Sequence, residues 1–494
     1  MPLSLRDSAT AAVKALQKWY GADSFAASTG LYHWDDPGLG GFNLIGFGLS
    51  LAGQLYAVED MERWWNSANA ITALIDYMSI TKDLTYLSVL ENTFTNAQKG
   101  YTVSTVGVVA GGVTGGAIGS AAGWVIAGPV GAVIGGLFGT ALGAGAAAAT
   151  YARNYNTNFF NEFYDDEGWW ALAWIKAYDL TKDRKYLDMA ATIQIDMSAG
   201  WDDVCSGGLW WGKSHDTPSG WNASVYKNAI TNELYLAISA ALYLRFKAFY
   251  PSGPVPPTVQ DFLNIAHMEW QWFNNSGLIN RRNLINDALL PACVNEETLP
   301  VWTYTQGVIL SGLCDMSEIT GDPSYRMRAE QIADALIQNP VAVPSGGTPE
   351  SGINLAGILT EWTDPYPAID HCQFKGIFIR NLAYLASKDR FPRYRAFILK
   401  NAASALNTMN SANQFGSSWS APIDTVDFVR QSAALDLLNA AMTVQYAVTN
   451  GSYVDILLLD EKRAGIDVSY LDPLLLNNEQ AEDVSYLDPL LKHD

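Results

Sequence analysis

Several residue types are scarce in this sequence of 494 residues, and each scarcity excludes a class of protein. The five histidines form neither HxxxH nor HExxH, and the four cysteines form no CxxC. We therefore expect no metal site and no cofactor. No GxSxG sequence occurs, which argues against a serine hydrolase built around that motif.

Positive charge is also scarce, with 30 Lys and Arg against 50 Asp and Glu and a net charge of −20. A nucleic acid partner is excluded, because its phosphate backbone would be repelled. No apolar segment typical of a signal peptide follows Met1, so the start of the sequence indicates no leader.

The few cysteines differ in their predicted surroundings. Cys314 falls in a predicted core helix and is expected to be a buried thiol. Cys205, Cys293 and Cys372 fall in predicted loops, where one disulfide can form in an oxidising compartment. The sequence leaves the pairing open.

What the sequence does contain is a helical period that recurs along the chain. A helix is predicted over 8–20, capped by Ser8, and another begins at Trp64. Similar polar turns end several helices, at 81–87, 181–187, 320–325 and 387–394. Stacked helical hairpins are typical of such repeats, and about six hairpins fit the length. The sequence therefore predicts an all-α fold, an (α/α)6 barrel over 1–455, with one cleft at the start of the inner helices.

The stretch from 100 to 152 departs from this pattern, because it holds no charged residue. Its spacing of small residues predicts two closely packed helices, each about as long as a bilayer is thick. We expect an inserted Gly/Ala-rich hairpin at 101–150. Two interpretations stay open, membrane contact through 107–149 or a self-packed insertion. Glycines recur every four residues in two runs, at Gly111, Gly115, Gly119 and Gly123, and at Gly131, Gly135, Gly139 and Gly143.

The end of the sequence, 456–494, is an acidic segment with a tandem repeat. The nine residues DVSYLDPLL occupy 467–475 and recur at 483–491. Such segments are typical of interaction tails, so we expect no part in catalysis.

The most informative stretch is 163–174, FYDDEGWWALAW, where two adjacent carboxylates precede an aromatic helix. Trp170 and Trp174 follow at helical spacing, which places Asp165 and Asp166 at the helix start. A retaining glycosidase uses two carboxyl groups about 5–5.5 Å apart, one as nucleophile and one as acid. Aromatic rings beside acids suit a sugar, whereas a solvent-exposed acidic helix cap is the alternative interpretation.

Further polar and aromatic residues are predicted at helix starts or in loops on the same rim. Trp211, in a Gly-rich loop, is expected to stack on a sugar without influencing the pH dependence of the reaction. Each residue alone is also explained by helix capping or by ordinary solvent exposure. The candidate substrate-binding residues are Asn66, Asn69, Trp169, Asp202, Trp211, Asn228, Tyr304, Gln306 and Lys375.

Six blocks of the sequence, taken in order, resemble glycoside hydrolase family 76, the endo-α-1,6-mannanases. The most specific is YDDEGWWALAWI at 164–175. The others are WNSAN at 65–69, GGLWW at 207–211, KNAITNE at 227–233, YTQG at 304–307 and QFKGIF at 373–378. The resemblance covers about 7–450, apart from the insertion.

This resemblance implies an (α/α)6 barrel that cleaves α-1,6-mannan with retention, with Asp165 as nucleophile and Asp166 as general acid/base. It implies no metal, a partner that is α-mannan or a mannosylated cell-wall polysaccharide, and an extracellular or cell-surface location. Two alternatives stay open. One is a transglycosylase that passes the mannosyl group to cell-wall glucan, and the other is a non-catalytic, membrane-associated mannan-binding protein.

Overall fold

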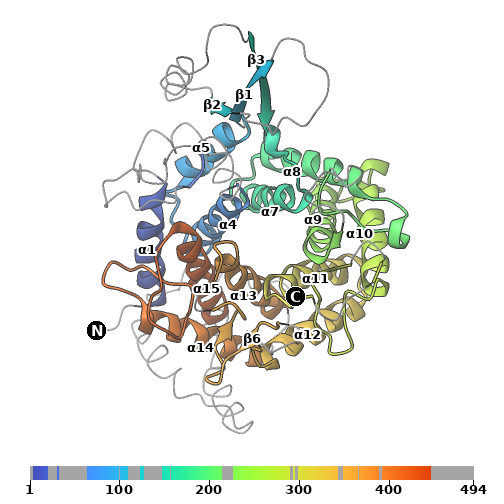
Figure 1. Cartoon of the computed structure of the whole chain (residues 1–494). Coiled ribbons are helices and arrows are strands. Elements are labelled where there is room, and N and C mark those ends of the chain that lie inside the picture. The colour runs from blue at the N-terminus through green and yellow to red at the C-terminus, as the bar shows by residue number, and fades with distance from the viewer. Residues whose placement is uncertain are drawn as a thin grey trace.

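Among the residues that the computed structural model describes, twelve α-helices form two concentric rings (Figure 1). The residues described are 4–20, 30–32, 64–99, 101–109, 123–126, 147–155, 157–213, 226–289, 293–294, 299–342, 349–364, 367–388 and 392–446.

The inner ring consists of helices that each pack on the next, and the last packs back on the first. An outer helix covers each inner one, so every unit is a helical hairpin or its equivalent. The predicted all-α (α/α)6 barrel is confirmed. The inner helices are α4 (Trp64–Thr81), α7 (Tyr164–Thr181), α9 (Ala229–Lys247), α11 (Val308–Thr320), α13 (His371–Lys388) and α15 (Phe428–Tyr446). The outer helices are α1 (Leu5–Leu16), α5 (Leu87–Ala97), α8 (Arg184–Met197), α10 (Pro257–Asn275), α12 (Pro323–Gln338) and α14 (Pro392–Thr408).

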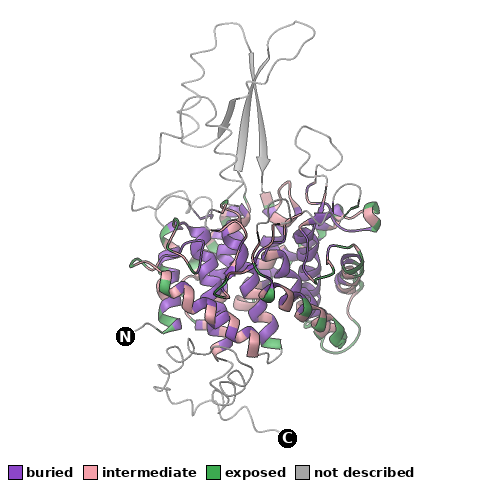
Figure 2. Ribbon diagram, turned by 60° about the horizontal axis from the view of Figure 1, so that its bottom comes forward, coloured by how far each residue is buried: buried purple, intermediate pink, exposed green. Residues whose placement is uncertain are grey.

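Apolar patterning explains which helices lie inside. α9 is buried on nearly all sides, and its sequence AITNELYLAISAALYL has almost no charge in its first sixteen residues. α8 buries one stripe, with Tyr186, Ala190, Ile193 and Met197 at helical spacing. Figure 2 shows the result, with buried residues through the rings and exposed ones on the outer helices.

The repeated turns between inner and outer helices have a common structure. Thr181 ends α7, Lys182 adopts a left-handed conformation with φ 60°, and Asp183 caps α8 by accepting from the backbone of Lys185. Gly321 and Asp322 do the same between α11 and α12. The sequence repeat therefore records a shared left-handed C-cap followed by an Asp N-cap.

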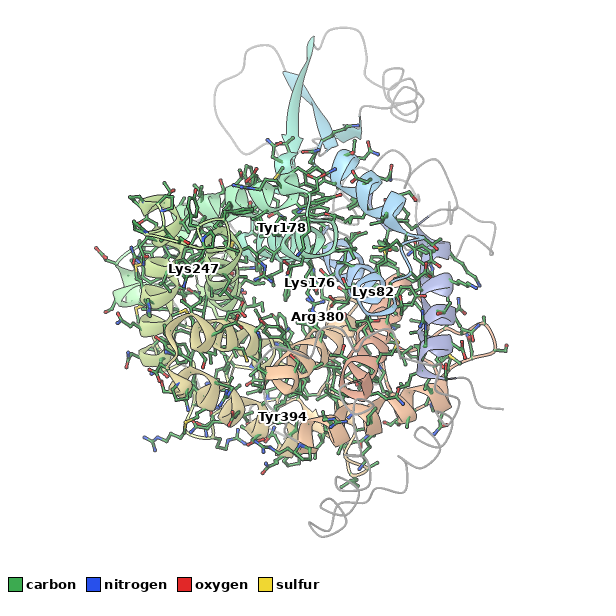
Figure 3. All side chains as sticks on the ribbon, turned by 180° about the vertical axis from the view of Figure 1, so that it is seen from behind. Lys82, Lys176, Tyr178, Lys247, Arg380 and Tyr394 are labelled. Carbon is green, nitrogen blue, oxygen red and sulfur yellow. A yellow bond between two sulfur atoms is a disulfide. The ribbon has the colours of Figure 1, made fainter. Side chains whose placement is uncertain are left out.

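Polar contacts join each inner helix to the next around the whole ring. They matter because the inner helices bring charged groups toward the axis, where Lys176 and Arg380 lie in Figure 3. In ring order the contacts are Asp76 with Lys176 (2.6 Å), Asp179 with Arg245 (2.6 Å), Glu233 with the Ile309 amide (3.2 Å), Asp315 with Tyr384 (2.5 Å), Arg380 with Asp436 (3.2 Å), and Asn439 with the Ala73 carbonyl (2.9 Å).

Two details, the cap of α1 and the place of Cys372, differ from the sequence prediction, and the structure shows the disulfide pairing that the sequence left open. α1 begins at Leu5 and is capped by Ser4, whereas Ser8 is buried inside the helix, so the predicted cap is wrong. Cys205 and Cys293 form the disulfide. Cys372 is a buried thiol in α13 and not a loop residue, while Cys314 is buried in α11 as predicted.

The insertion contains a three-stranded antiparallel sheet, β1 (Tyr101–Val109), β2 (Gly123–Ile126) and β3 (Ala147–Tyr155), in the order β2-β1-β3. The predicted helical hairpin is wrong at these strands, because the β-branched residues in YTVSTVGVV favour extended backbone. β1 and β3 pair from Tyr101 with Tyr155 to Val109 with Ala147. Apart from Gly123, which begins β2, the two glycine runs lie outside the described residues.

The acidic repeat at 456–494 also lies outside the described residues. In the part of the chain that the structure describes, no helix has both the length and the apolar content needed to cross a membrane.

Candidate active site

The first turn of α7 carries three consecutive acids, Asp165, Asp166 and Glu167. One and two turns further along the helix lie Trp170 and Trp174, which are fully buried and stack on each other at 5.5 Å between ring centroids. This aromatic packing fixes the helix, and hence the position of its first turn.

Asp165 receives hydrogen bonds on both carboxylate oxygens. The indole nitrogen of Trp211 lies 2.9 Å from Oδ1 and 2.9 Å from Oδ2, and the backbone amide of Asp166 lies 3.0 Å from Oδ1. The Asn228 amide lies 3.5 Å from Oδ2. Burial raises the pKa of Asp165 to about 7, and these donors oppose the rise because they favour the carboxylate.

Asp166 has a different environment. Its Oδ2 accepts one hydrogen bond, of 2.6 Å, from the side chain of Asn161. Burial, and then the charge of Asp165, raise the pKa of Asp166 well above its usual range, and Asp370 adds to this. Asp165 is thus surrounded by hydrogen-bond donors that favour its carboxylate, whereas the surroundings of Asp166 favour its protonated form.

Aromatic rings line the space beside these acids. Trp169 lies 6.0 Å from Trp65 and 6.5 Å from Tyr304, measured between ring centroids. Tyr304 stacks on Phe374 at 3.8 Å. Because the negative charge of Asp165 contributes to the raised pKa of Tyr304, the ring is electrostatically close to that carboxylate.

A further acid, Asp287, belongs to the same region. It precedes β5 (Ala288–Leu289), which pairs with β4 (Lys227–Asn228) so that Ala288 faces Asn228. Its carbonyl accepts from the Ala229 amide at 2.8 Å. Burial raises the pKa of Asp287 to about 6, and its charge is felt by Tyr226 and Tyr304, as is that of Asp165.

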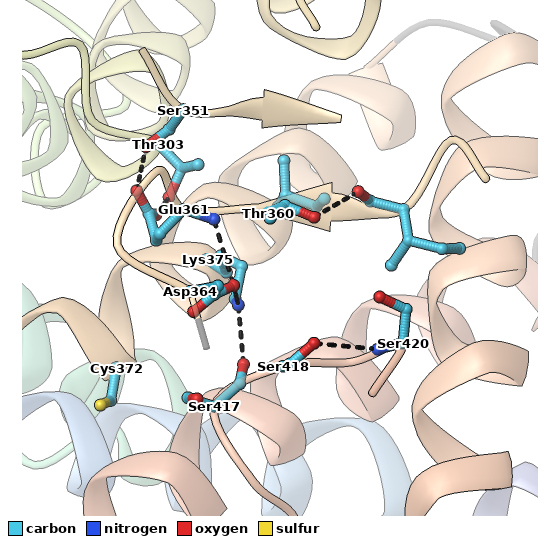
Figure 4. Close-up of polar contacts among 12 residues, drawn as sticks. Thr303, Ser351, Thr360, Glu361, Asp364, Cys372, Lys375, Ser417, Ser418 and Ser420 are labelled. Atoms are coloured by element: carbon cyan, nitrogen blue, oxygen red, sulfur yellow. Dashed lines mark hydrogen bonds and ion pairs between the residues drawn. The ribbon is translucent and has the colours of Figure 1, made fainter. Parts of the chain in front are cut away.

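Four of the predicted sugar-binding side chains lie in the barrel wall and bond to protein groups. They are fully buried and hydrogen-bonded within the protein, so sugar binding by these four residues stays a prediction. Asn66 donates to Gln373, and Asn69 accepts from Arg380 and donates to the Trp65 carbonyl. Gln306 forms hydrogen bonds with the backbone of Ile285 and Trp302. Lys375 pairs with Asp364 and donates to the Ser417 carbonyl (Figure 4).

Asp202 is likewise paired, with Lys227 at 2.7 Å and the Trp210 indole at 2.8 Å. Lys227 also donates to three carbonyls of the loop, those of Val204, Gly207 and Gly208. Asp202 therefore holds the loop that presents Trp211. Of the predicted residues, the structure gathers Trp211 and Asn228 directly at Asp165, with Trp169 and Tyr304 nearby.

Sequence reasoning missed Asn161 and Asp287. Asn161 lies four residues before Asp165 in NEFYDD, where an Asn before a helix start was a usable signal for capping or acid contact. Asp287 had no such signal, because its partner strand β4 is about sixty positions away. Within the described residues, no group of three or more His, Cys, Asp or Glu side chains is arranged to hold a metal ion.

Comparison with known sequences identifies one matching family. The sequence model of Glycosyl hydrolase family 76 matches residues 141–451. The chain is 26% identical over 184 residues to mannan endo-1,6-alpha-mannosidase DFG5 of Candida albicans, covering 35% of this chain and 37% of the relative. It is 24% identical over 182 residues to mannan endo-1,6-alpha-mannosidase DCW1 of Saccharomyces cerevisiae, with the same 35% and 37% coverage. The alignment thus spans little more than a third of these curated relatives.

Solved structures share the fold. An inactive variant of the alpha-1,6-mannanase GH76A of Salegentibacter sp. HEL1_6, in complex with alpha-1,6-mannotriose, superposes with a TM-score of 0.58 at 19% identity, covering 89% of this chain and 99% of that one. In that variant two consecutive aspartates are replaced by asparagine. Dfg5 from Chaetomium thermophilum, in complex with glucosamine, gives 0.57 at 15% identity, covering 90% of each chain.

Proposed function

The chain belongs to glycosyl hydrolase family 76, and we propose that it is a retaining endo-α-1,6-mannosidase. In this proposal Asp165 is the nucleophile and Asp166 the general acid/base. The substrate is α-1,6-mannan or a mannosylated cell-wall polysaccharide.

The observation that carries the proposal is the unequal environment of two adjacent carboxyl groups. Asp165 accepts hydrogen bonds from Trp211, the Asp166 amide and Asn228, which favour its carboxylate and oppose the rise of its pKa to about 7. Asp166 has one side-chain donor among the described residues, and its pKa is raised well above its usual range. A retaining glycosidase needs this division between an ionised nucleophile and a protonated acid.

The chemistry proceeds in two steps. The Asp165 carboxylate attacks the anomeric carbon and the glycosidic bond breaks, while Asp166 gives its proton to the departing sugar oxygen. The ionised Asp166 then takes a proton from water, whose oxygen displaces Asp165 from the sugar. Both carboxyl groups return to their starting states.

Names of related proteins support the substrate class. Two curated relatives are mannan endo-1,6-alpha-mannosidases. The Salegentibacter mannanase was captured with alpha-1,6-mannotriose after two consecutive aspartates were changed. We assign this role to Asp165 and Asp166, the adjacent aspartates in the first turn of α7.

The test is product analysis of linear α-1,6-mannan with the purified protein and its variants. Asp165→Asn should abolish turnover and prevent a covalent mannosyl-enzyme from forming. Asp166→Asn should lower turnover of mannan by about 10²–10⁴-fold, because proton transfer is lost, and less with an activated leaving group. Wild-type rates in both variants would show that these residues are not the catalytic pair.

The same reaction run with an acceptor glucan separates hydrolysis from transglycosylation. A hydrolase releases free manno-oligosaccharides whether or not glucan is present, whereas a transglycosylase produces glucan that carries mannosyl groups. Mannan binding without any product would favour the non-catalytic alternative.

The proposed substrate places the protein outside the cell or at its surface. Contact of 107–149 with a membrane remains part of this proposal, since that segment holds no charge. Flotation of the full chain with liposomes tests it.

A further inference from the structure

The side-chain oxygen, the side-chain nitrogen and the backbone N–H of Asn161 all form hydrogen bonds in the segment that carries Asp165 and Asp166. Its Nδ2 donates to Asp166 Oδ2 at 2.6 Å, and its Oδ1 accepts from the Phe163 amide at 2.9 Å. Its backbone nitrogen donates to Glu167 Oε1 at 2.6 Å. Because the Phe163 amide can only donate, the bond to Oδ1 fixes which end of the Asn161 amide faces Asp166.

Glu167 is buried in the protein and accepts a hydrogen bond from the backbone of Asn161. It is fully buried, and its Oε1 accepts from both the Asn161 amide and Lys213 Nζ, the latter at 2.5 Å. Lys213 also bonds Asp196 on α8 at 2.5 Å. The third acid of the run is thus a buried carboxyl group with a structural role, bonded to a lysine.

Lys213 and Trp211 belong to one short segment that pairs with the segment of Asn161. The Tyr164 amide donates to the Trp211 carbonyl at 3.0 Å, and the Lys213 amide donates to the Glu162 carbonyl at 3.0 Å. Between them Phe163 and Gly212 form an antiparallel bridge. One pair of segments therefore holds Asp165 through Trp211 and reaches Asp166 through Asn161.

We infer that Asn161 is the positioning residue for the acid/base Asp166, and that the buried Glu167–Lys213 ion pair holds Asn161 in place. The inference rests on the proposed function, since it assigns Asp166 its role. With Oδ2 occupied by the Asn161 donor, Oδ1 is the oxygen that carries the proton to the leaving group and takes one from water. Asn161 acts on the substrate only through Asp166.

The hydrogen bond from Asn161 also influences the balance between the protonated and ionised forms of Asp166. A donor to Oδ2 favours the carboxylate and so opposes the rise in pKa that burial and Asp165 impose. Asp166 must be protonated for the first step and ionised for the second. The Asn161 bond therefore keeps the ionised form accessible after the leaving group departs.

The experiment compares Asn161→Ala and the isosteric Asn161→Asp with wild type, on mannan and on an aryl α-1,6-mannobioside with a dinitrophenolate leaving group. Both variants should lose roughly tenfold or more in kcat/KM on mannan and much less on the aryl substrate, which needs little acid assistance. The alkaline limb of the pH profile on mannan should move to higher pH, because Asp166 loses its donor. Asn264→Ala, an exposed position on α10, is the matched control and should change neither quantity.

Lys213→Met tests the supporting ion pair and should reproduce the alkaline shift in a weaker form. Equal losses on both substrates with an unmoved alkaline limb would overturn the inference, since a purely structural residue gives that result. The isosteric Asp variant, monitored by thermal unfolding, decides the question if the alanine variant does not fold. Absence of wild-type mannan cleavage would instead count against the proposed function.

Discussion

The role of Trp211 depends on the hydrogen-bond partner of its indole nitrogen as well as on its aromatic ring. Trp211 is partly exposed and stacks on Phe163 and Tyr226, with ring centroids 4.6 and 5.2 Å away. Sequence reasoning treated it as a ring for sugar stacking only. In the structure its indole nitrogen lies 2.9 Å from each oxygen of Asp165, so its N–H favours the ionised form of this proposed nucleophile.

Trp211→Phe should therefore change the pH dependence of the reaction. Loss of the N–H raises the pKa of Asp165 further above about 7, so the acidic limb of kcat/KM should shift to higher pH. At pH 6 the rate should fall roughly tenfold, since a hydrogen bond to a charged group contributes about 1.5–3 kcal/mol. Steady-state kinetics from pH 4 to 9 measure both effects.

The adjacent Trp210 provides the control. Its indole donates to Asp202 and not to Asp165, so Trp210→Phe should leave the acidic limb where it is. An unmoved limb in Trp211→Phe would mean that this hydrogen bond does not tune the nucleophile.

Asp287 is predicted to bind sugar hydroxyls. The described residues give its carboxylate no hydrogen-bond partner, although the residue lies beside Asn228 in the β4–β5 ribbon. Asp287→Asn should raise KM for mannan by about 10–100-fold, because a charged acceptor is worth about 1.5–3 kcal/mol. Asp188→Asn, on the exposed side of α8, should have no effect on KM. An unchanged KM in Asp287→Asn would place this acid outside the substrate path.

At the residue scale, the sequence singled out Asp165 and Asp166, the pair proposed to be reactive, and two of the residues that the structure places beside them. Asp165 and Asp166 stand in one contiguous motif, and Trp211 and Asn228 lie in Gly-rich or cap positions that local rules recognise. Local rules cannot separate residues such as Gln306 and Lys375 into binding and structural ones, because a polar residue at a helix start looks the same whether it faces a ligand or bonds a neighbouring loop. Burial distinguishes the two cases, and burial depends on tertiary packing.

Helices were predictable from the sequence where a single spacing of apolar residues dominated. The apolar spacing of α4, α7 and α13 placed these helices within a few residues, and the Thr–Lys–Asp turns marked the hairpins. In the insertion two signals competed, a four-residue glycine spacing and a run of β-branched residues. At 101–109 the β-branched run decides, because glycine is a poor helix former and its spacing stabilises a helix only against a partner.

The β1–β3 ladder suggests where the insertion can be removed. Replacing 107–149 by a short Gly/Ser turn keeps the paired residues from Tyr101 with Tyr155 to Val106 with Thr150. Such a deletion should leave mannan cleavage within about twofold of wild type, since the β-branched ladder at the base of the insertion is retained. It should also abolish any association with liposomes.

Circular dichroism and flotation of both proteins check this expectation. A deleted protein that loses its helical signal would show that the segment is integral to the barrel. A full-length chain that never floats would rule out the membrane interpretation.

The whole molecule carries many buried carboxyl groups, and these set its pH stability. Burial raises the pKa of Glu361 and Asp436 to about 7, and that of Glu269 well above its usual range. In the unfolded chain such groups titrate near pH 4. Between pH 4 and 7 the folded state holds more protons, so its stability falls as pH rises through this window.

The melting temperature should therefore be highest near pH 4 and decline as the pH rises from about 4 to 7. Below pH 4 a second loss is expected, because groups such as Asp424, whose pKa is lowered, become protonated. Glu269→Gln should reduce the decline, since both Glu269 oxygens are buried without a partner among the described residues and an amide cannot ionise. Calorimetry of the two proteins across pH 4–9 measures the difference; parallel curves would contradict the assignment.

The closed ring has a consequence for synthesis of the chain. The contacts of α15 with the first helices join residues far apart in sequence, 366 positions for Asn439 with Ala73 and 419 for Gln431 with Ala12. A ribosome adds about 5–20 residues per second, so Ala73 waits roughly 20–70 s for its partner. During that interval the apolar surface of α4 that α15 will cover stays open to solvent or to a chaperone. Nascent chains that stop before α15 should therefore be the form of this protein most prone to aggregate.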